Sequence, residues 1–205
     1  MPLFYEHIND FAKIAIWHIA EERNFFLKRV LLQNEITHPH KQLQHLAGRY
    51  LLQYLHPEFP YHLIEIADTR KPFLPNEEYH FSISHCGEYA AVIVSKDYCV
   101  GIDIELIKPK VEKIKYKFLS EDELNNIQYS TFNTQHLTLL WCCKEAVFKW
   151  YGSGGVDFKK NIHLDVKNIV TNDGMINCDF IKEEKISLQI NYKFFNGMCL
   201  AWVQS

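Results

Sequence analysis

The 205-residue chain contains no long run of apolar residues. A membrane-spanning helix needs about 20 consecutive apolar residues, whereas the apolar stretch from Phe11 to Ala20 is shorter and is interrupted by Lys13 and His18. This stretch also lacks a basic leading segment and a small-residue cleavage site, so we do not expect a signal peptide. We therefore do not expect a membrane as partner.

The chain also lacks a strong excess of either charge and any C-x-x-C pair. Its formal net charge is −3, which gives no general reason to expect nucleic acid as a partner and requires any basic patch to be local. Six cysteines are scattered along the chain: Cys86, Cys99, Cys142, Cys143, Cys178 and Cys199. We expect them to be reduced, mostly buried thiols, and the protein to be cytoplasmic.

No low-complexity linker divides the chain, yet an order of helices followed by strands occurs twice. In the first half, after one or two strands in residues 1–20, hydrophobic periodicity predicts helices and then strands. The helices are expected at 21–32 and 39–56, and the strands at 62–66, 79–84, 89–95 and 98–106. The second helix begins with Pro39, at a position where proline is tolerated.

The second half repeats this order. A short helix follows Ser120, a longer one covers 136–151, and three or four strands lie between 162 and 203. Turns are expected at 172–174 and at the Asn-Gly pair 196–197. The sequence therefore predicts an α+β fold of two similar halves, residues 1–98 and 99–205.

The first segment that carries chemistry reads V-G-I-D-I-E, from Val100 to Glu105. Side chains at i and i+2 of a strand share a face, so Asp103 and Glu105 point together while the isoleucines enter the core. Two neighbouring carboxylates raise each other's proton affinity unless a cation neutralises them. Taken alone, the segment still favours a strand with one solvated face.

The second segment reads W-C-C-K-E-A-V-F-K, from Trp141 to Lys149. Glu145 and Lys149 are four residues apart and lie on one face of the expected helix. Alone, they are best interpreted as an exposed ion pair that contributes only a few tenths of a kcal/mol. Trp141, one turn earlier on the same side, argues against a fully solvated face.

Together, the two segments supply three carboxylates, from Asp103, Glu105 and Glu145. An all-oxygen set with few protein ligands suits Mg²⁺ better than Ca²⁺ or Zn²⁺, although it does not separate Mg²⁺ from Mn²⁺. Lys149 is placed to meet a phosphate oxygen as a point charge. Such an arrangement is what phosphoryl-type transfer needs, because its catalysis is mostly positioning and charge neutralisation.

The motif G-I-D-x-E, followed along the chain by W-x-x-K-E-A-x-x-K, resembles the paired signature of the 4′-phosphopantetheinyl transferase superfamily. Three upstream segments resemble further family motifs in the family's order: Leu46–Arg49, Lys71–Pro72 and Phe81–His85. The chain's size points to the two-halved, surfactin-synthetase-activating type. The resemblance implies halves related by a pseudo-twofold axis, with coenzyme A in the cleft between them.

This resemblance implies the activity of a holo-acyl-carrier-protein synthase. Such an enzyme moves 4′-phosphopantetheine from coenzyme A to a serine of an apo acyl or peptidyl carrier protein and releases 3′,5′-ADP. Asp103, Glu105 and Glu145 would hold Mg²⁺ in the C-terminal half. Glu145 is the candidate general base, and Lys149 would contact the phosphate that is transferred or released.

The resemblance also implies coenzyme contacts in the N-terminal half. Ser84 and His85 match residues that bind coenzyme phosphates, and Lys71 matches a residue beside the adenine. Arg49, in the second helix, is a further candidate. Gln44 stands where some relatives carry an arginine, so the contacts to the 3′-phosphate stay open.

A lysine cluster follows the carboxylate strand and consists of Lys108, Lys110, Lys113, Lys115 and Lys117. It would steer an acidic carrier protein, or it is an ordinary solvated loop or helix face. Two internal halves already supply the cleft, so a monomer suffices. The competing functions are a Mg²⁺-dependent phosphohydrolase or nuclease, a catalytically silent coenzyme A-binding protein, and a structural assembly protein.

Overall fold

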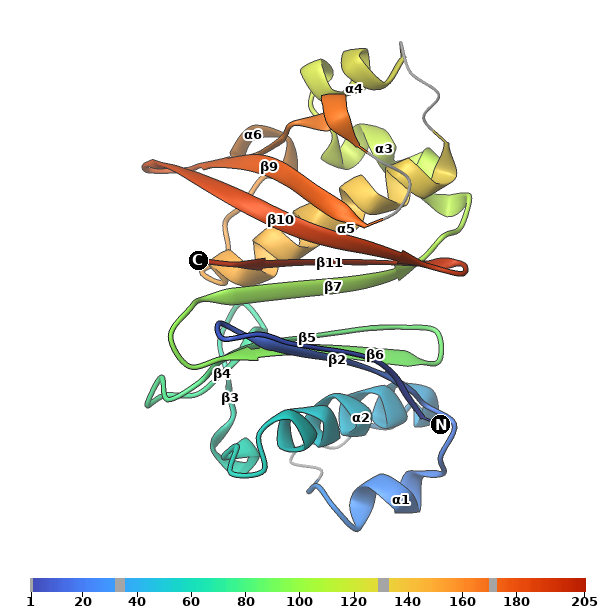
Figure 1. The fold of residues 1–205 in the computed structure, drawn as a ribbon, viewed down its shortest axis with the longest axis vertical. Coiled ribbons are helices and arrows are strands. Elements are labelled where there is room, and N and C mark those ends of the chain that lie inside the picture. Colours follow the sequence, from blue (N-terminus) through green and yellow to red (C-terminus); the bar gives the residue numbers. More distant parts are fainter. Residues whose placement is uncertain (1, 32–35, 129–132, 170–172) are drawn as a thin grey trace. The chain divides into compact units, whose positions relative to one another are not determined.

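The computed structural model describes residues 2–31, 36–128, 133–169 and 173–205. The chain divides into two compact units, residues 1–100 and 101–205. Each unit combines helices with an antiparallel sheet (Figure 1), so the α+β fold class predicted from the sequence is confirmed. No helix among the described residues is long and apolar enough to cross a membrane.

The first unit contains a four-stranded antiparallel sheet in the order β1-β2-β6-β5. Its strands are β1 (Leu3–Ile8), β2 (Lys13–His18), β5 (His80–Cys86) and β6 (Tyr89–Ser95). The long helix α2 (Pro39–Leu55) lies across one face of this sheet (Figure 1). Smaller elements complete the unit: α1 (Arg23–Leu27), a 3₁₀ turn (Tyr61–Leu63), β3 (Glu65–Ile66) and β4 (Pro72–Phe73).

The core of the first unit follows from the period-two pattern of its strands. Trp17 on β2 and Val92 on β6 belong to the same buried cluster as Leu46 and Leu51 of α2. Pro39 begins α2, where its missing N–H is harmless, and the His38 side chain accepts a hydrogen bond from the Lys41 N–H. The unit therefore holds α2 against the sheet by one continuous apolar layer.

The second unit contains a five-stranded antiparallel sheet in the order β7-β11-β10-β9-β8. Its strands are β7 (Val100–Leu106), β8 (Ile162–Leu164), β9 (Gly174–Ile181), β10 (Lys185–Phe195) and β11 (Met198–Gln204). Its helices are α3 (Lys110–Phe118), α4 (Glu121–Gln128), α5 (Thr134–Tyr151) and α6 (Phe158–Asn161), with a 3₁₀ turn at Val166–Asn168. Helix α5 packs along β11 (Figure 1), and Gly101 of β7 lies against it.

Local signals determine where α5 begins and ends. The Asn133 side chain accepts hydrogen bonds from the backbone N–H groups of Gln135 and His136, and the His136 ring accepts one in return from the Asn133 N–H. Gly152 ends the helix with a φ of 71°, a conformation that glycine adopts without steric cost. The helix therefore presents a defined face to β7.

Two sequence expectations differ from the structure, and a third falls partly outside the described residues. The helix expected at 21–32 is limited to α1, where Phe26 is buried, and residues 32–35 lie outside the described part. The strand expected at 62–66 is a 3₁₀ turn followed by the two residues of β3, because Pro72 on β4 has no N–H to extend the ladder. The turn expected at 172–174 begins at a residue outside the described part.

Candidate active site

Strand β7 presents its alternate side chains to helix α5, as the period of a strand predicts. Asp103 forms an ion pair with Lys149 of α5, and Glu105 accepts a hydrogen bond from the indole of Trp141 on the same helix. The intervening Ile104 is buried. The two motifs predicted to carry the chemistry therefore lie against each other in the second unit.

A glycine permits this close approach of strand and helix. A Cβ atom on Gly101 would lie 2.0 Å from the carbonyl oxygen of Ala146 and 2.6 Å from the backbone nitrogen of Trp150. Both contacts are shorter than atoms tolerate, and both involve backbone that cannot move without shifting α5. Residue 101 must therefore be glycine for the carboxylates of β7 to reach α5.

The Asp103–Lys149 pair is short and shielded from solvent. The Lys149 Nζ donates to Asp103 Oδ1 at 2.6 Å, while the Asp103 side chain is 5% exposed and the Lys149 side chain 25%. Trp141 Nε1 donates to Glu105 Oε1 at 3.0 Å. This hydrogen bond orients the Glu105 carboxylate. It accounts for the position of Trp141 on the same side of the helix as Glu145 and Lys149.

Both neighbouring carboxylates affect the pKa of Glu145, which lies on α5. Burial, first, and the charge of Asp103, second, raise the pKa of Glu145 to about 7, with a smaller contribution from Glu105 and an opposing one from Lys149. Burial and Asp103 also raise the pKa of Glu105, against the hydrogen bond from Trp141. The three carboxylates are therefore electrostatically coupled, and added positive charge would stabilise their ionised forms.

The donor set fits a hard cation in its chemistry. All three candidate ligands are carboxylates, the oxygen donors that Mg²⁺ prefers, and the raised pKa values of Glu105 and Glu145 mark a place that favours positive charge. Among the described residues, however, no group of three or more His, Cys, Asp or Glu side chains is arranged as a metal site.

The first lysine of the W-x-x-K-E-A-x-x-K motif, Lys144, has a different environment from that of Lys149. Lys144 is fully buried, and its Nζ donates to Glu123 Oε2 at 2.7 Å and to the carbonyl oxygens of Phe158 and Ile162 at 2.9 and 2.8 Å. Sequence reasoning gave this lysine no role. Its position four residues after Leu140, on the apolar stripe of α5, was the signal that it would be buried.

In the first unit, Arg49 is 4% exposed and contacts another basic group. Its Nη1 lies 3.2 Å from Nδ1 of His45, one turn earlier on α2. Burial lowers the pKa of Arg49 to about 10, and burial, Arg49 and His85 together lower that of His45 to about 4. Within the described residues, the Arg49 Nε is buried without a hydrogen-bond partner.

The predicted coenzyme contacts are only partly brought together. His85 is exposed on β5 and lies close enough to His45 to lower its pKa, so Arg49 and His85 border the same basic region. Ser84 is buried, and as the neighbouring strand residue it points to the opposite face of the sheet. Lys71 instead lies near Cys99, and burial lowers its pKa. Sequence reasoning missed His45, although its spacing of four from Arg49 places both on one helix face.

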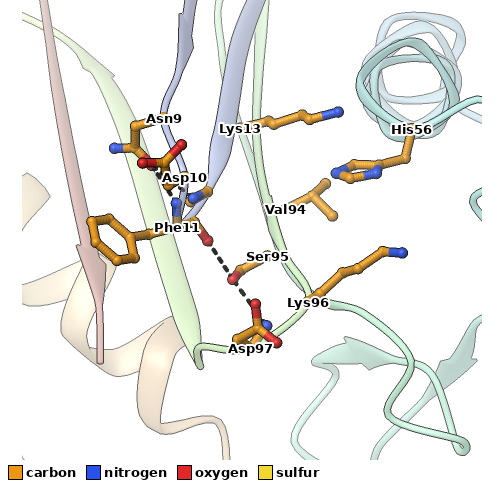
Figure 2. A pocket seen from close by; sticks show the side chains of 10 residues that line it. Asn9, Asp10, Phe11, Lys13, His56, Val94, Ser95, Lys96 and Asp97 are labelled. Atoms are coloured by element: carbon orange, nitrogen blue, oxygen red, sulfur yellow. Dashed lines mark hydrogen bonds between the residues drawn. The ribbon is translucent and has the colours of Figure 1, made fainter.

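A hollow of about 140 Å³ lies elsewhere in the first unit. Figure 2 shows Lys13 and Lys96 extending toward the side of His56, with Asp10 and Asp97 on the other side. Burial, Lys13 and Lys96 lower the pKa of His56 to about 4. None of the predicted site residues lines this hollow, and its mixture of acidic and basic groups favours no single ligand class.

Comparison with known proteins identifies a family that matches the second unit. The family model described as the 4′-phosphopantetheinyl transferase superfamily matches residues 99–202. A 4′-phosphopantetheinyl transferase of Bacillus subtilis is 34% identical over 92 residues, which cover 43% of this chain and 41% of the relative. Enterobactin synthase component D of Escherichia coli is 43% identical over 68 residues, 33% of this chain and 32% of the relative. The matched segments span less than half of these relatives.

Proposed function

Because the chain belongs to the 4′-phosphopantetheinyl transferase superfamily, we propose that it transfers the 4′-phosphopantetheine of coenzyme A to a serine of an apo acyl or peptidyl carrier protein. One observation carries this proposal: β7 and α5 bring Asp103 and Glu105 together with Lys149 in a partly buried cluster. A cluster of carboxylates beside a lysine suits the charge neutralisation on which phosphoryl-type transfer depends.

Asp103, Glu105 and Glu145 would hold Mg²⁺ in this scheme. The bound ion would neutralise charge on the coenzyme's pyrophosphate and on the departing 3′,5′-ADP. Lys149 offers its ammonium to a phosphate oxygen. Glu145 is the candidate general base that accepts the proton of the carrier serine. The serine oxygen then forms its bond to phosphorus as the bond to the 3′,5′-ADP oxygen breaks.

In this proposal the N-terminal half, residues 1–98, supplies the coenzyme contacts. The C-terminal half, residues 99–205, supplies the magnesium site. A buried guanidinium beside two histidines suits an anion, and the buried Nε of Arg49 is a donor that a phosphate would satisfy. We assign Arg49, Lys71, Ser84 and His85 to the coenzyme, together with Lys149 from the second unit. His45 joins them because it contacts Arg49 directly.

Helix α3 is the proposed docking site for the carrier protein. Lys110, Lys113 and Lys117 are exposed on it, and Tyr116 is 63% exposed beside them. Carrier proteins are typically acidic, so this face complements them in charge and offers an aromatic contact. We further propose that the protein is cytoplasmic, since all six cysteines are free thiols. It would act as a monomer on carrier proteins and not on nucleic acid.

Intact-mass spectrometry of the carrier tests the function. An apo acyl and an apo peptidyl carrier protein are each incubated with the protein, coenzyme A and Mg²⁺, with and without EDTA. We expect a metal-dependent gain of one phosphopantetheine with the wild type, none with Asp103→Asn, and wild-type behaviour with Asp179→Asn. Asp179 is a matched control because its carboxylate pairs with Lys185 on the exposed side of the same unit.

Two results would overturn the proposal. Absence of the mass gain on both carriers, with a folded protein, would remove the transferase activity. Full activity of Asp103→Asn would separate the transfer from the carboxylate cluster. Release of phosphate from coenzyme A without any carrier would instead favour the phosphohydrolase that uses the same carboxylates.

A further inference from the structure

Lys149 pairs with an oxygen of Asp103, a carboxylate that the proposed function assigns to a metal ion. Its Nζ lies 2.6 Å from Asp103 Oδ1, in a pair whose aspartate is 5% exposed. At this distance the ammonium and the carboxylate form a charge-assisted hydrogen bond. A lysine that only awaited a phosphate would have no need of this contact.

The ammonium also compensates the charge of the whole carboxylate cluster. Lys149 lowers the pKa of both Glu105 and Glu145, against the burial and the Asp103 charge that raise them. Lys108 acts in the same direction on Glu105, but it is an exposed side chain. Lys144 points elsewhere, since its ammonium is engaged by Glu123.

A divalent cation and the Lys149 ammonium cannot share this place without strong repulsion. Both carry positive charge, both seek the same oxygens, and the site is partly shielded from water, where Coulomb interactions are stronger than in bulk solvent. Binding of Mg²⁺ at Asp103 therefore requires the lysine to leave. Its flexible four-carbon stem allows it to do so, and a phosphate oxygen is a partner that compensates the loss.

We propose that Lys149 is an internal counter-cation. Its ammonium occupies the metal site in the coenzyme-free protein and moves to the pyrophosphate when coenzyme A binds. This inference rests on the proposed function, since it takes the cluster to be a metal site. Its consequence is that metal binds the free protein weakly and binds tightly together with coenzyme A. The coupling is reciprocal, so metal must also strengthen coenzyme binding.

Metal binding to the coenzyme-free protein tests this directly. Mn²⁺ serves as the probe, and its free concentration is followed by electron paramagnetic resonance at pH 8. We expect Lys149→Met to bind Mn²⁺ about tenfold more tightly than the wild type, within the usual range of coupling between two ligands. Lys149→Arg keeps the positive charge and should stay close to the wild type.

Two controls separate this effect from general changes. Lys185→Met removes a lysine from an exposed ion pair with Asp179 and should leave the Mn²⁺ affinity unchanged. Asp103→Asn should weaken Mn²⁺ binding in the wild-type and in the Lys149→Met background. Adding coenzyme A should raise the Mn²⁺ affinity of the wild type by a larger factor than that of Lys149→Met.

The outcomes distinguish this inference from the proposed function. Equal or weaker Mn²⁺ binding by folded Lys149→Met overturns the counter-cation role, even if the wild type modifies carrier proteins. Tighter binding by Lys149→Met supports the role, even if no carrier gains mass. Mn²⁺ binding that survives Asp103→Asn places the metal elsewhere and overturns the inference.

Discussion

Gly101 and Ala146 approach so closely that a Cβ atom on residue 101 would lie 2.0 Å from the Ala146 carbonyl oxygen. This contact, and not a requirement for a positive φ, explains the glycine of the G-I-D-x-E motif. It lets β7 lie against α5 at the point where Asp103 meets Lys149. The spacing of the carboxylate cluster thus depends on one absent methyl group.

Gly101→Ala is therefore expected to destabilise the protein and to reduce transferase activity. The methyl group must push β7 and α5 apart, and overpacking of this kind costs about 1–3 kcal/mol, occasionally more. Urea unfolding and the carrier mass assay measure the two effects. Gly197→Ala is the control, because nothing lies within 4 Å of its Cβ position and only its φ of 78° is unfavourable. Equal activity of the two variants would contradict this account.

Lys144→Met is expected to lower the free energy of unfolding by about 3–5 kcal/mol, because it leaves the buried Glu123 carboxylate without its cation. Glu123 would keep its hydrogen bonds from the backbone N–H groups of Ser120 and Leu164. Urea unfolding measures the loss. Adding Glu123→Gln should recover part of it, since the uncompensated charge is then removed.

The exposed Lys185–Asp179 pair is the control for this prediction. Its side chains are 58% and 40% exposed, so Lys185→Met should cost no more than about 1 kcal/mol. A similar loss for Lys144→Met would show that burial of the Lys144 pair does not matter for stability.

Elements with a clear local signal could be predicted from the sequence. The apolar run 89–95 predicts a strand with the bounds of β6, and Pro39 marks the start of α2. The two motifs were expected to meet, and they do. What the sequence could not show was the partner of each side chain, because pairing depends on how α5 packs against β7.

Lys144 and His45 illustrate this limit. The spacing of Lys144 from Leu140 signals that it is buried, but only the structure shows that Glu123 and two backbone carbonyls are its partners. His45 was one of 11 histidines, and its contact with Arg49 became visible only when the helix was placed.

Glu145 predicts how stability depends on pH. Its pKa is raised from 4.5 to about 7 in the folded protein, so between these values the folded state holds a proton that the unfolded chain has lost. The free energy of unfolding therefore falls as pH rises through this window, by at most about 3 kcal/mol. Glu145→Gln removes this loss and should be more stable than the wild type at pH 8 but not below pH 4.5.

Urea unfolding in metal-free buffer with EDTA, at several pH values, measures this difference. Added Mg²⁺ should reduce the gap at pH 8, because a cation stabilises the ionised carboxylate. Parallel stability profiles for the wild type and Glu145→Gln would show that Glu145 titrates near its ordinary value.

The exposed lysines of α3 predict how turnover depends on salt. If Lys110 and Lys113 steer an acidic carrier toward the protein, kcat/KM for the carrier should fall as ionic strength rises, since charges more than about 8–10 Å apart are screened at physiological salt. Lys110→Ala/Lys113→Ala should lower kcat/KM about tenfold at low salt, within the usual range of electrostatic steering. Lys159→Ala/Lys160→Ala, which removes the same charge from α6, should have a smaller effect. Coenzyme A affinity separates the explanations: if salt weakens it as much as turnover, the lysines of α3 form only a solvated helix face.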